Sequence, residues 1–261
     1  MSIVDIGDTR LFVRDEGDGP AVLFIHGFPL DHTVWLDQVA GMRNRHRCIA
    51  PDLRGYGMSD RTTETTIPMR RFAGDLVALV DHLEVERVNV VGLSMGGYVA
   101  LALWELAPQV FRSMVLMDTR AGADGEAARA KRDAGIAGLL TDGRAILASN
   151  LVGALLTEPP SPDAAARLRT MVEATPYETI VASLRGMRDR SDRTGMLSTI
   201  SVPTLVMSGA DDRLMSAEDQ ALMTDTIPNA TAVVIDGASH LPSIEKPQET
   251  TEALRGFLDS V

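Results

Sequence analysis

Six short apolar runs alternate along this chain with segments of helical periodicity, and that alternation limits the folds open to it. Runs so short, and rich in Val, Ile or Leu, are typical of strands buried on both faces of a parallel sheet. Strands that alternate with helices favour a doubly wound, mostly parallel α/β sheet with right-handed crossovers. The runs are Ala21–Ile25, Cys48–Ala50, Val88–Val91, Met114–Met117, Thr204–Met207 and Ala232–Ile235.

Other elements are predicted around these runs. Two alternating segments at the N-terminus, Ile3–Ile6 and Leu11–Arg14, indicate an antiparallel pair that turns through Gly7 and Asp8. Helices are predicted where apolar residues recur at helical spacing or where a cap residue or proline marks a start. These helices are 72–83 after Pro68, Ser94–Ala107, a segment beginning at Ser216, and 247–258.

One long segment interrupts the alternation. From about residue 120 to residue 197 only helical patterns occur, with predicted helix starts at Ser161-Pro162 and at Thr175-Pro176, where Glu178 completes a capping box. The sequence therefore predicts a core of residues 1–119 and 198–261 and an all-helical cap over residues 120–197. Caps of this kind shape substrate pockets and exclude water.

Composition excludes several functional classes. The 25 basic and 36 acidic residues give a net charge of −11, which disfavours binding to nucleic acid. No apolar run approaches the roughly 18 residues that span a bilayer, and the N-terminus lacks a signal-peptide pattern, so we expect a cytoplasmic location without membrane attachment. The one cysteine, Cys48, excludes an internal disulfide and a Cys-pair metal site, and its apolar neighbours favour burial.

The segment Gly92-Leu93-Ser94-Met95-Gly96 fits the pattern G-x-S-x-G between a predicted strand and a predicted helix. A serine in such a turn is held in strained backbone geometry with its hydroxyl above the edge of the sheet. Glycines at 92 and 96 suit the close approach of strand and helix. Ser94 is therefore the predicted nucleophile.

The loop His26-Gly27-Phe28-Pro29 follows the first buried strand. Because Pro29 has no N–H, the donor that this loop offers is the backbone amide of Phe28. Together with the amide of Met95, it would form a two-donor oxyanion hole at the start of the helix that follows Ser94. We expect His26 itself to be structural.

A serine nucleophile needs a base, and the base needs an acid that orients it. Four of the five histidines, at positions 26, 32, 46 and 82, precede Ser94 in the chain, whereas His240 follows the last strand run, where ligands meet an open α/β sheet. His240 is thus the predicted base. For the acid, Asp212 is the choice, with Asp211 a close competitor and Asp118, after the preceding strand, a third candidate.

These motifs resemble those of the α/β-hydrolase superfamily, and within it the lidded bacterial serine esterases, 3-oxoadipate enol-lactonases and cofactor-free haloperoxidases. The order Ser94, Asp212, His240 is the order that this superfamily uses. The resemblance places the nucleophile on Ser94, the base on His240, the acid on Asp212 through a Gly-x-x-Asp pattern, and the oxyanion donors on the amides of Phe28 and Met95. The similar stretches are 26–31, 51–60, Gly92–Gly97, Pro203–Asp212 and Ser239–Pro247. In the second of them, Arg54 and Asp60 are expected to anchor the loop.

The constellation predicts a serine hydrolase that cleaves esters or lactones through an acyl-enzyme intermediate, with no metal or organic cofactor. From the resemblance we expect a small to medium, partly apolar ester or lactone as substrate. Two alternatives stay open: a C–C bond hydrolase acting on ring-cleavage diketones with the same three residues, and a small-molecule receptor on the same fold. The sequence leaves the oligomeric state open.

Overall fold

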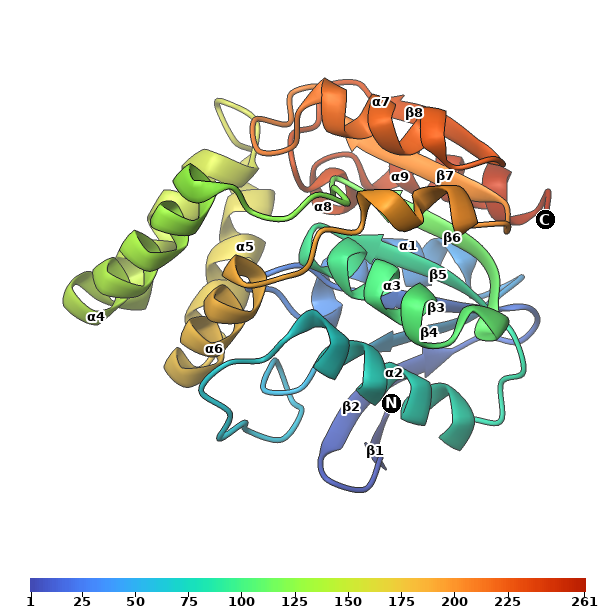
Figure 1. Cartoon of the computed structure of the whole chain (residues 1–261), viewed down its shortest axis with the longest axis horizontal. Helices are drawn as coiled ribbons and strands as arrows, with labels where there is room; N and C mark the ends of the chain where they lie inside the picture. The colour runs from blue at the N-terminus through green and yellow to red at the C-terminus, as the bar shows by residue number, and fades with distance from the viewer.

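A twisted eight-stranded sheet runs through the centre of the protein in a computed structural model that describes residues 1–261 (Figure 1). The strand order is β1-β2-β4-β3-β5-β6-β7-β8; β2 pairs antiparallel with β1 and β4, and the remaining neighbours are parallel. The strands are β1 (Ser2–Asp5), β2 (Arg10–Glu16), β3 (Ala21–Ile25), β4 (Arg47–Pro51), β5 (Val88–Leu93), β6 (Phe111–Met117), β7 (Thr204–Gly209) and β8 (Ala230–Ile235). This confirms the predicted fold class, including the N-terminal antiparallel pair.

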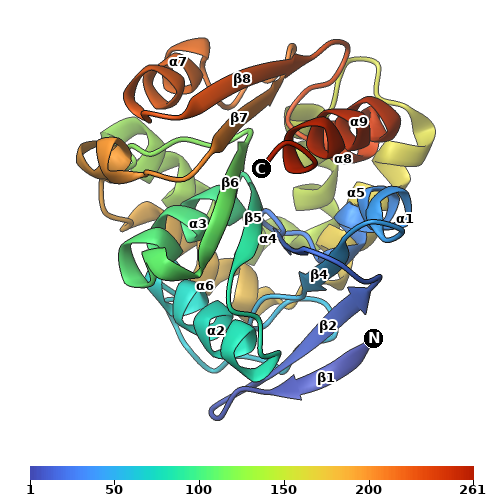
Figure 2. The ribbon, with the colours of Figure 1, turned by 90° about the vertical axis from the view of Figure 1, so that its right-hand side faces the viewer.

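Helices cover both faces of the sheet, with α2, α3 and α7 on one side and α1, α8 and α9 on the other (Figure 2). Two apolar cores result, one on each face, with 44 and 30 buried residues. The helices of these layers are η1 (His32–Trp35), α1 (Leu36–Met42), α2 (Met69–His82), α3 (Met95–Leu106), η2 (Pro108–Val110), η3 (Thr194–Thr199), α7 (Ala217–Thr226), α8 (Pro242–Glu245) and α9 (Pro247–Leu258).

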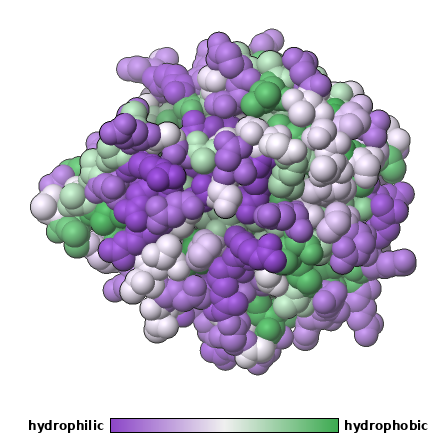
Figure 3. Space-filling view, in the orientation of Figure 1, coloured by the Kyte–Doolittle hydropathy of each residue, from purple (hydrophilic) through white to green (hydrophobic).

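Three helices are inserted between β6 and β7: α4 (Glu126–Leu155), α5 (Pro162–Ala174) and α6 (Tyr177–Arg188). They lie beyond the end of the sheet, at the left of Figure 1. The longest, α4, is broken at Gly143, whose φ of 80° is not helical. Figure 3 shows polar side chains over most of this face and an apolar patch at the projecting end, where Figure 1 draws α4. No helix combines the length and the apolar content needed to cross a membrane.

Two local expectations are wrong. The run Ala232–Ile235 lies in β8, which is an edge strand rather than one buried on both faces, and Val234 is 58% exposed. Thr175 does not cap α6: its N–H bonds to the last turn of α5, and its hydroxyl donates to the carbonyls of Met171 and Pro29. Ser161, in contrast, caps α5 as predicted, because its hydroxyl accepts the N–H of Ala164.

The loop after β4 is anchored by the two residues expected to do so. The Arg54 guanidinium binds the buried carboxylate of Asp75 on α2 at 2.7 and 2.9 Å, and it also reaches Asp8 at the N-terminal hairpin. Asp60 binds the guanidinium of Arg10 at the surface. The loop is thereby held against the sheet, next to the strand ends that carry the candidate site.

Candidate active site

Ser94 occupies the turn between β5 and α3 with a φ of 54° and a ψ of −114°, a strained conformation for a residue with a side chain. Its N–H donates to the carbonyl of Met117, and the hydroxyl of Thr119 donates to its carbonyl at 2.8 Å. A methyl group at Gly96 would lie 2.2 Å from the carbonyl oxygen of Ile25, so only glycine lets α3 begin this close to β3. The turn therefore has the geometry that the G-x-S-x-G pattern predicts.

The imidazole of His240 lies between Ser94 and Asp212. Its Nε2 is 2.8 Å from the Ser94 hydroxyl oxygen, and its Nδ1 is 2.9 Å from Oδ2 of Asp212. The loop that carries His240 is tied to the inserted helices, because its backbone N–H donates to the carbonyl of Leu155 at the end of α4. The three side chains thus form a continuous hydrogen-bonded chain from Ser94 to Asp212, the predicted nucleophile and acid, although they are far apart in the sequence.

The acid in this chain is Asp212, and its two oxygens have different partners. Oδ1 accepts the N–H groups of Leu214 and Met215, at 2.8 and 3.3 Å, while Oδ2 faces the imidazole. Burial alone would raise the pKa of Asp212, but the hydrogen bond and charge of His240, with the N–H of Leu214, bring the pKa below its ordinary value. An ionised carboxylate is what an orienting acid requires.

The alternative acids and histidines lie elsewhere or serve other purposes. Asp211 is exposed, whereas Asp118 is fully buried beside Asp212. His26 is fixed in the loop after β3: its Nδ1 bonds to the carbonyl of Gly27 and its Nε2 accepts the N–H of Leu53. Burial lowers the pKa of His26, so it is a neutral, structural side chain.

The two amides expected to bind an oxyanion lie on either side of Ser94. A methyl group added at Gly27, beside Phe28, would lie 3.3 Å from Cβ of Ser94, which places this loop next to the nucleophile. The N–H of Phe28 donates to no acceptor in the protein. Met95 is the first residue of α3, where backbone N–H groups have no intrahelical acceptor. Both donors are therefore available to a ligand.

Ser94 and His240 open into a cavity of about 490 Å³ between the sheet and the inserted helices. Most of its lining is apolar, which suits the body of a small organic molecule. The lining also contains three cationic side chains, Arg120, Lys131 and Arg132, and no acidic one. The lining of this cavity is therefore positively charged although the chain as a whole has a net charge of −11.

A buried carboxylate organises the cationic side of this cavity. Asp124 binds Arg120 at 2.7 Å, Arg132 at 3.0 Å and Arg190 at 2.6 Å. One negative charge thus meets three positive ones, and Lys131, which forms no ion pair, adds a fourth. Sequence reasoning missed this cluster, although Arg120, Asp124 and Arg132 are spaced at multiples of four residues where the insertion begins.

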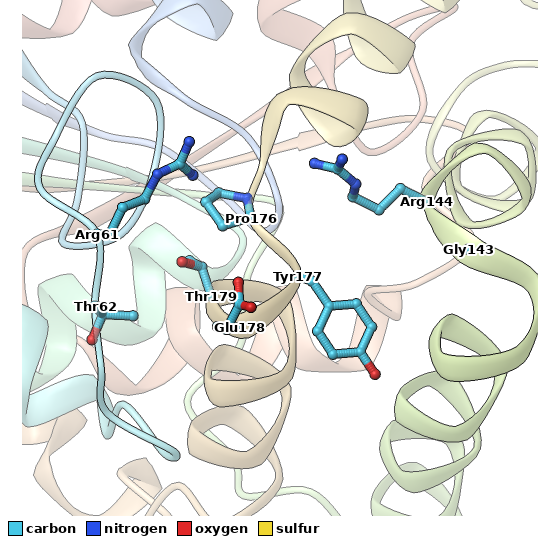
Figure 4. Close-up of a pocket in the computed structure, with 8 residues that line it drawn as sticks. All are labelled: Arg61, Thr62, Gly143, Arg144, Pro176, Tyr177, Glu178 and Thr179. Carbon is cyan, nitrogen blue, oxygen red and sulfur yellow. The ribbon is translucent and has the colours of Figure 1, made fainter.

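A second hollow lies on the flank of the inserted helices, and Figure 4 shows it. Its volume is about 630 Å³, and its lining is polar, with Arg61, Arg144, Tyr177 and Glu178 around the start of α6. Arg61 comes from the loop after β4 and Arg144 from α4, on opposite sides of the hollow. It contains none of the three hydrogen-bonded residues, so the cavity above Ser94 is the candidate active site.

Two groups of side chains have donor atoms close enough to hold a metal ion. One consists of Asp31, His32 and Asp52, but the Asp52 carboxylate already accepts the N–H groups of His32 and Met58 and contacts the His32 ring. The other consists of Asp118, Asp212 and His240, whose ring nitrogens are engaged as described above. Neither group offers a set of free ligands.

Comparisons with known proteins identify the family to which this fold belongs. A family model described as the alpha/beta hydrolase fold matches residues 20–247. The 3-oxoadipate enol-lactonase 1 of Acinetobacter baylyi is 28% identical over 249 residues, which cover 94% of this chain and 90% of that protein. A thermophilic esterase from Thermogutta terrifontis, solved with malate bound, superposes with a TM-score of 0.92 at 35% identity, covering 97% of this chain and 94% of the other.

A bromoperoxidase from Bacillus anthracis shares the fold, with a TM-score of 0.89 at 23% identity and coverage of 99% of each chain. A putative non-heme bromoperoxidase of Mycobacterium tuberculosis is 30% identical over 270 residues, which cover 97% of this chain and 98% of that protein. The resemblance to esterases, enol-lactonases and haloperoxidases thus extends over nearly the whole chain. The family model alone spans far more than half of the sequence, and its range contains Ser94, Asp212 and His240. The chain belongs to the alpha/beta hydrolase fold family.

Proposed function

We propose that this protein is a serine hydrolase that cleaves small to medium carboxylic esters or lactones. The observation that carries the proposal is the chain of hydrogen bonds from Ser94 through His240 to Asp212, at 2.8 and 2.9 Å. Ser94, at one end of this chain, faces a largely apolar cavity. The backbone N–H groups of Phe28 and Met95 lie next to Ser94 and are available to a ligand. A nucleophile, a base, an orienting acid and oxyanion donors are together the requirements of acyl transfer.

The reaction would proceed in two halves. His240 takes the proton of Ser94 as the serine oxygen attacks the acyl carbonyl, and the amides of Phe28 and Met95 hold the oxyanion that forms. The leaving alcohol takes the proton from His240, which leaves an acyl-enzyme on Ser94. Water then attacks the acyl-enzyme with the same base and the same donors, and Asp212 stabilises the imidazolium in both halves.

The cavity lining supports a substrate with an apolar body and a negatively charged group. Arg120, Arg132 and Lys131 face the same space as Ser94, and the one carboxylate among them, Asp124, is shared by three arginines. The positive charge left over favours a substrate that carries a carboxylate in addition to its scissile bond. The name of the enol-lactonase relative and the malate in the esterase structure are consistent with this preference.

The first experiment measures hydrolysis of p-nitrophenyl acetate, p-nitrophenyl butyrate and a γ-lactone by the wild type and by Ser94→Ala. Saturable turnover that Ser94→Ala abolishes supports the proposal. Turnover that survives in Ser94→Ala would show that the nucleophile is another residue. Absence of turnover in folded wild-type protein would overturn the esterase assignment; hydrolysis of a vinylogous diketone would then favour the C–C hydrolase, and ligand binding without turnover the receptor.

A matched substrate pair tests the charge preference. The mono-p-nitrophenyl ester of succinate and p-nitrophenyl butyrate have acyl chains of equal length and differ in a terminal carboxylate. We expect a lower KM for the charged ester, and a loss of that preference of up to roughly fivefold in Lys131→Gln, because Lys131 is exposed and an exposed charge contact is worth up to about 1 kcal/mol. The control is Lys246→Gln, which removes the other lysine of the chain, outside the cavity. Equal KM values for the two esters would refute the preference.

A further inference from the structure

Asp118 is a buried acidic residue that the reaction described above leaves without a role. It directly follows β6 and is completely shielded from solvent, and its φ of 45° lies in the left-handed region. Its N–H donates to the carbonyl of Met207, and its Oδ1 accepts the N–H of Gly209, each at 2.9 Å. Asp118 thus joins the end of β6 to the end of β7. The strand β7 ends at Gly209, three residues before Asp212.

The carboxyl group of Asp118 lies beside the acid of the hydrogen-bonded chain. Oδ2 is buried and accepts no N–H or O–H group. One carboxyl oxygen of Asp118, one of Asp212 and a ring nitrogen of His240 all lie within 4.8 Å of one another. No arginine or lysine pairs with Asp118 to balance a second negative charge at this position.

The charges around Asp118 favour its neutral form. Burial is the largest influence and raises its pKa well above the ordinary value, and the charge of Asp212 raises the pKa further. Glu245, on α8, acts in the same direction, and only the N–H of Gly209 opposes it. Two carboxyl groups this close in a buried site hold one proton between them, and the less hydrogen-bonded one keeps it.

We propose that Asp118 is a positioning residue that holds a proton and donates a hydrogen bond from its O–H to the Asp212 carboxylate. The proposal rests on the proposed function, because it concerns how the orienting acid of that reaction is held. Asp212 then has a donor on every side: the N–H groups of Leu214 and Met215, the imidazole of His240, and the carboxylic acid of Asp118. The hydrogen bond from Asp118 also helps to keep the pKa of Asp212 low.

The proposal predicts different effects for Asp118→Asn and Asp118→Leu, two substitutions of similar size. Asparagine at position 118 presents an oxygen to Gly209 and an N–H to Asp212, as a protonated aspartic acid does. Leucine fills the same space but offers neither an acceptor nor a donor. If Asp118 were instead an ionised carboxylate, asparagine would remove a negative charge beside the imidazole and the two variants would behave alike.

Infrared spectroscopy tests the proton directly and needs no substrate. At pH 8 the difference spectrum of wild type minus Asp118→Asn is expected to contain the C=O stretch of a protonated carboxyl group. The same difference for Asp211→Asn, the exposed neighbour of Asp212, is expected to contain carboxylate bands only. A carboxylate signal for Asp118 at pH 8 would overturn the proposal, whether or not the enzyme has been shown to cleave esters.

Kinetics with an ester substrate test the positioning. We expect Asp118→Leu to lower kcat about tenfold with little change in KM, because a hydrogen bond to a charged group is lost and no substrate contact is. Asp118→Asn is expected to restore most of kcat and to leave the acidic limb of the kcat/KM profile in place. A shift of that limb to lower pH in Asp118→Asn, or an unimpaired Asp118→Leu, would refute the proposal. Should leucine prevent folding, the asparagine variant decides alone.

The two proposals fail in different ways. If the wild type cleaves no ester, the proposed function falls while the infrared band still reports on the proton of Asp118. If the wild type is an active esterase that Ser94→Ala inactivates but the infrared band is absent, the proposed function stands and the role of Asp118 falls.

Discussion

The strained backbone of Ser94 is held in place by hydrogen bonds and by the close approach of β5 and α3. The N–H and carbonyl of Ser94 are both held by the end of β6, and Gly92 and Gly96 let strand and helix approach each other without a side chain between them. The same approach places the N–H of Met95 at the open end of α3. Backbone geometry at a few residues thus positions both the proposed nucleophile and one of the proposed oxyanion donors.

Gly96→Ala tests this dependence. The new methyl group would meet the carbonyl oxygen of Ile25 at 2.2 Å, so α3 must move away from β3. We expect a loss of about 1–3 kcal/mol in the free energy of unfolding, measured in urea, and a fall in kcat as Met95 shifts. The control is Gly74→Ala on α2, where the methyl group meets nothing within 4 Å and helix propensity favours alanine. Equal stability of the two variants would contradict the close-packing argument.

The raised pKa of Asp118 predicts how stability changes with pH. A carboxyl whose pKa is higher in the folded than in the unfolded state adds stability at low pH and loses that contribution as the pH rises through the folded-state pKa. Asparagine does not titrate. The Tm of Asp118→Asn relative to wild type is therefore expected to rise with pH from about 4, the pKa of an unfolded aspartate. A difference in Tm that is constant with pH would contradict the raised pKa.

Some residues of the site can be identified from the sequence because they belong to local patterns. Others cannot, because their placement depends on tertiary contacts. Ser94, Phe28 and His240 sit in local patterns at strand ends, and a linear pattern is enough to select them. The residues alone left Asp211 and Asp118 open beside Asp212, because the choice depends on which side chain reaches the imidazole. The contact between Asp118 and Asp212 exists only because β6 and β7 are neighbours in the sheet, which no local pattern states.

At the scale of elements, the loop after β4 is fastened by a buried ion pair. The carboxylate of Asp75 on α2 is 2% exposed and receives two hydrogen bonds from Arg54 in that loop. A buried charge without its partner is far more costly than the pair, because it must be desolvated without compensation. The pair therefore links the position of the loop to the stability of the whole fold.

Arg54→Met is expected to destabilise the protein by about 3 kcal/mol, because it removes both hydrogen bonds to the buried Asp75 and leaves only Arg71, at 3.9 Å, to balance its charge. Replacing both partners, as Arg54→Met with Asp75→Leu, is expected to recover part of that loss. The control is Arg10→Met, which breaks the exposed pair with Asp60 and should cost about 1 kcal/mol or less. Urea unfolding measures all three, and a double variant less stable than Arg54→Met would contradict the argument.

Elements with strong periodicity or a clear start signal were predictable, and shorter ones were not. Proline or a cap residue correctly marked the starts of α5, α7 and α9, whereas α2, predicted over 72–83 from its apolar spacing, begins earlier, at Met69. The motif at Thr175 misled because the threonine faces back into the end of α5 and toward the loop of Pro29, a tertiary contact. The short helices η1, α1 and α8 have too few turns to show a period, and their formation depends on packing.

Across the whole molecule, the inserted helices do not form a core of their own. Leu139, Ile180 and Leu184 belong to the apolar cluster on one face of the sheet, whereas Val152 and Leu168 belong to the cluster on the other. Hydrogen bonds add to this packing, as between Leu155 and His240. We therefore expect the predicted cap over residues 120–197 to depend on the sheet for its stability.

One cooperative unfolding transition is therefore expected. Trp35 and Trp104, one in each apolar cluster, report on the core by fluorescence, and circular dichroism reports on all helices, including α4 to α6. The two signals should give the same midpoint in urea. Loss of helical signal at a lower urea concentration than the change in fluorescence would show that the insertion unfolds by itself.

The placement of two carboxyl groups at the ends of adjacent strands also bears on how such a site can change over generations. A lineage that lost Asp212 would still have a carboxyl oxygen within 4.8 Å of a ring nitrogen of His240, from Asp118 on the next strand. Relieved of its charged neighbour, that carboxyl would ionise more readily. The fold thus has a second position from which a carboxyl group could orient His240, at the end of β6 instead of β7.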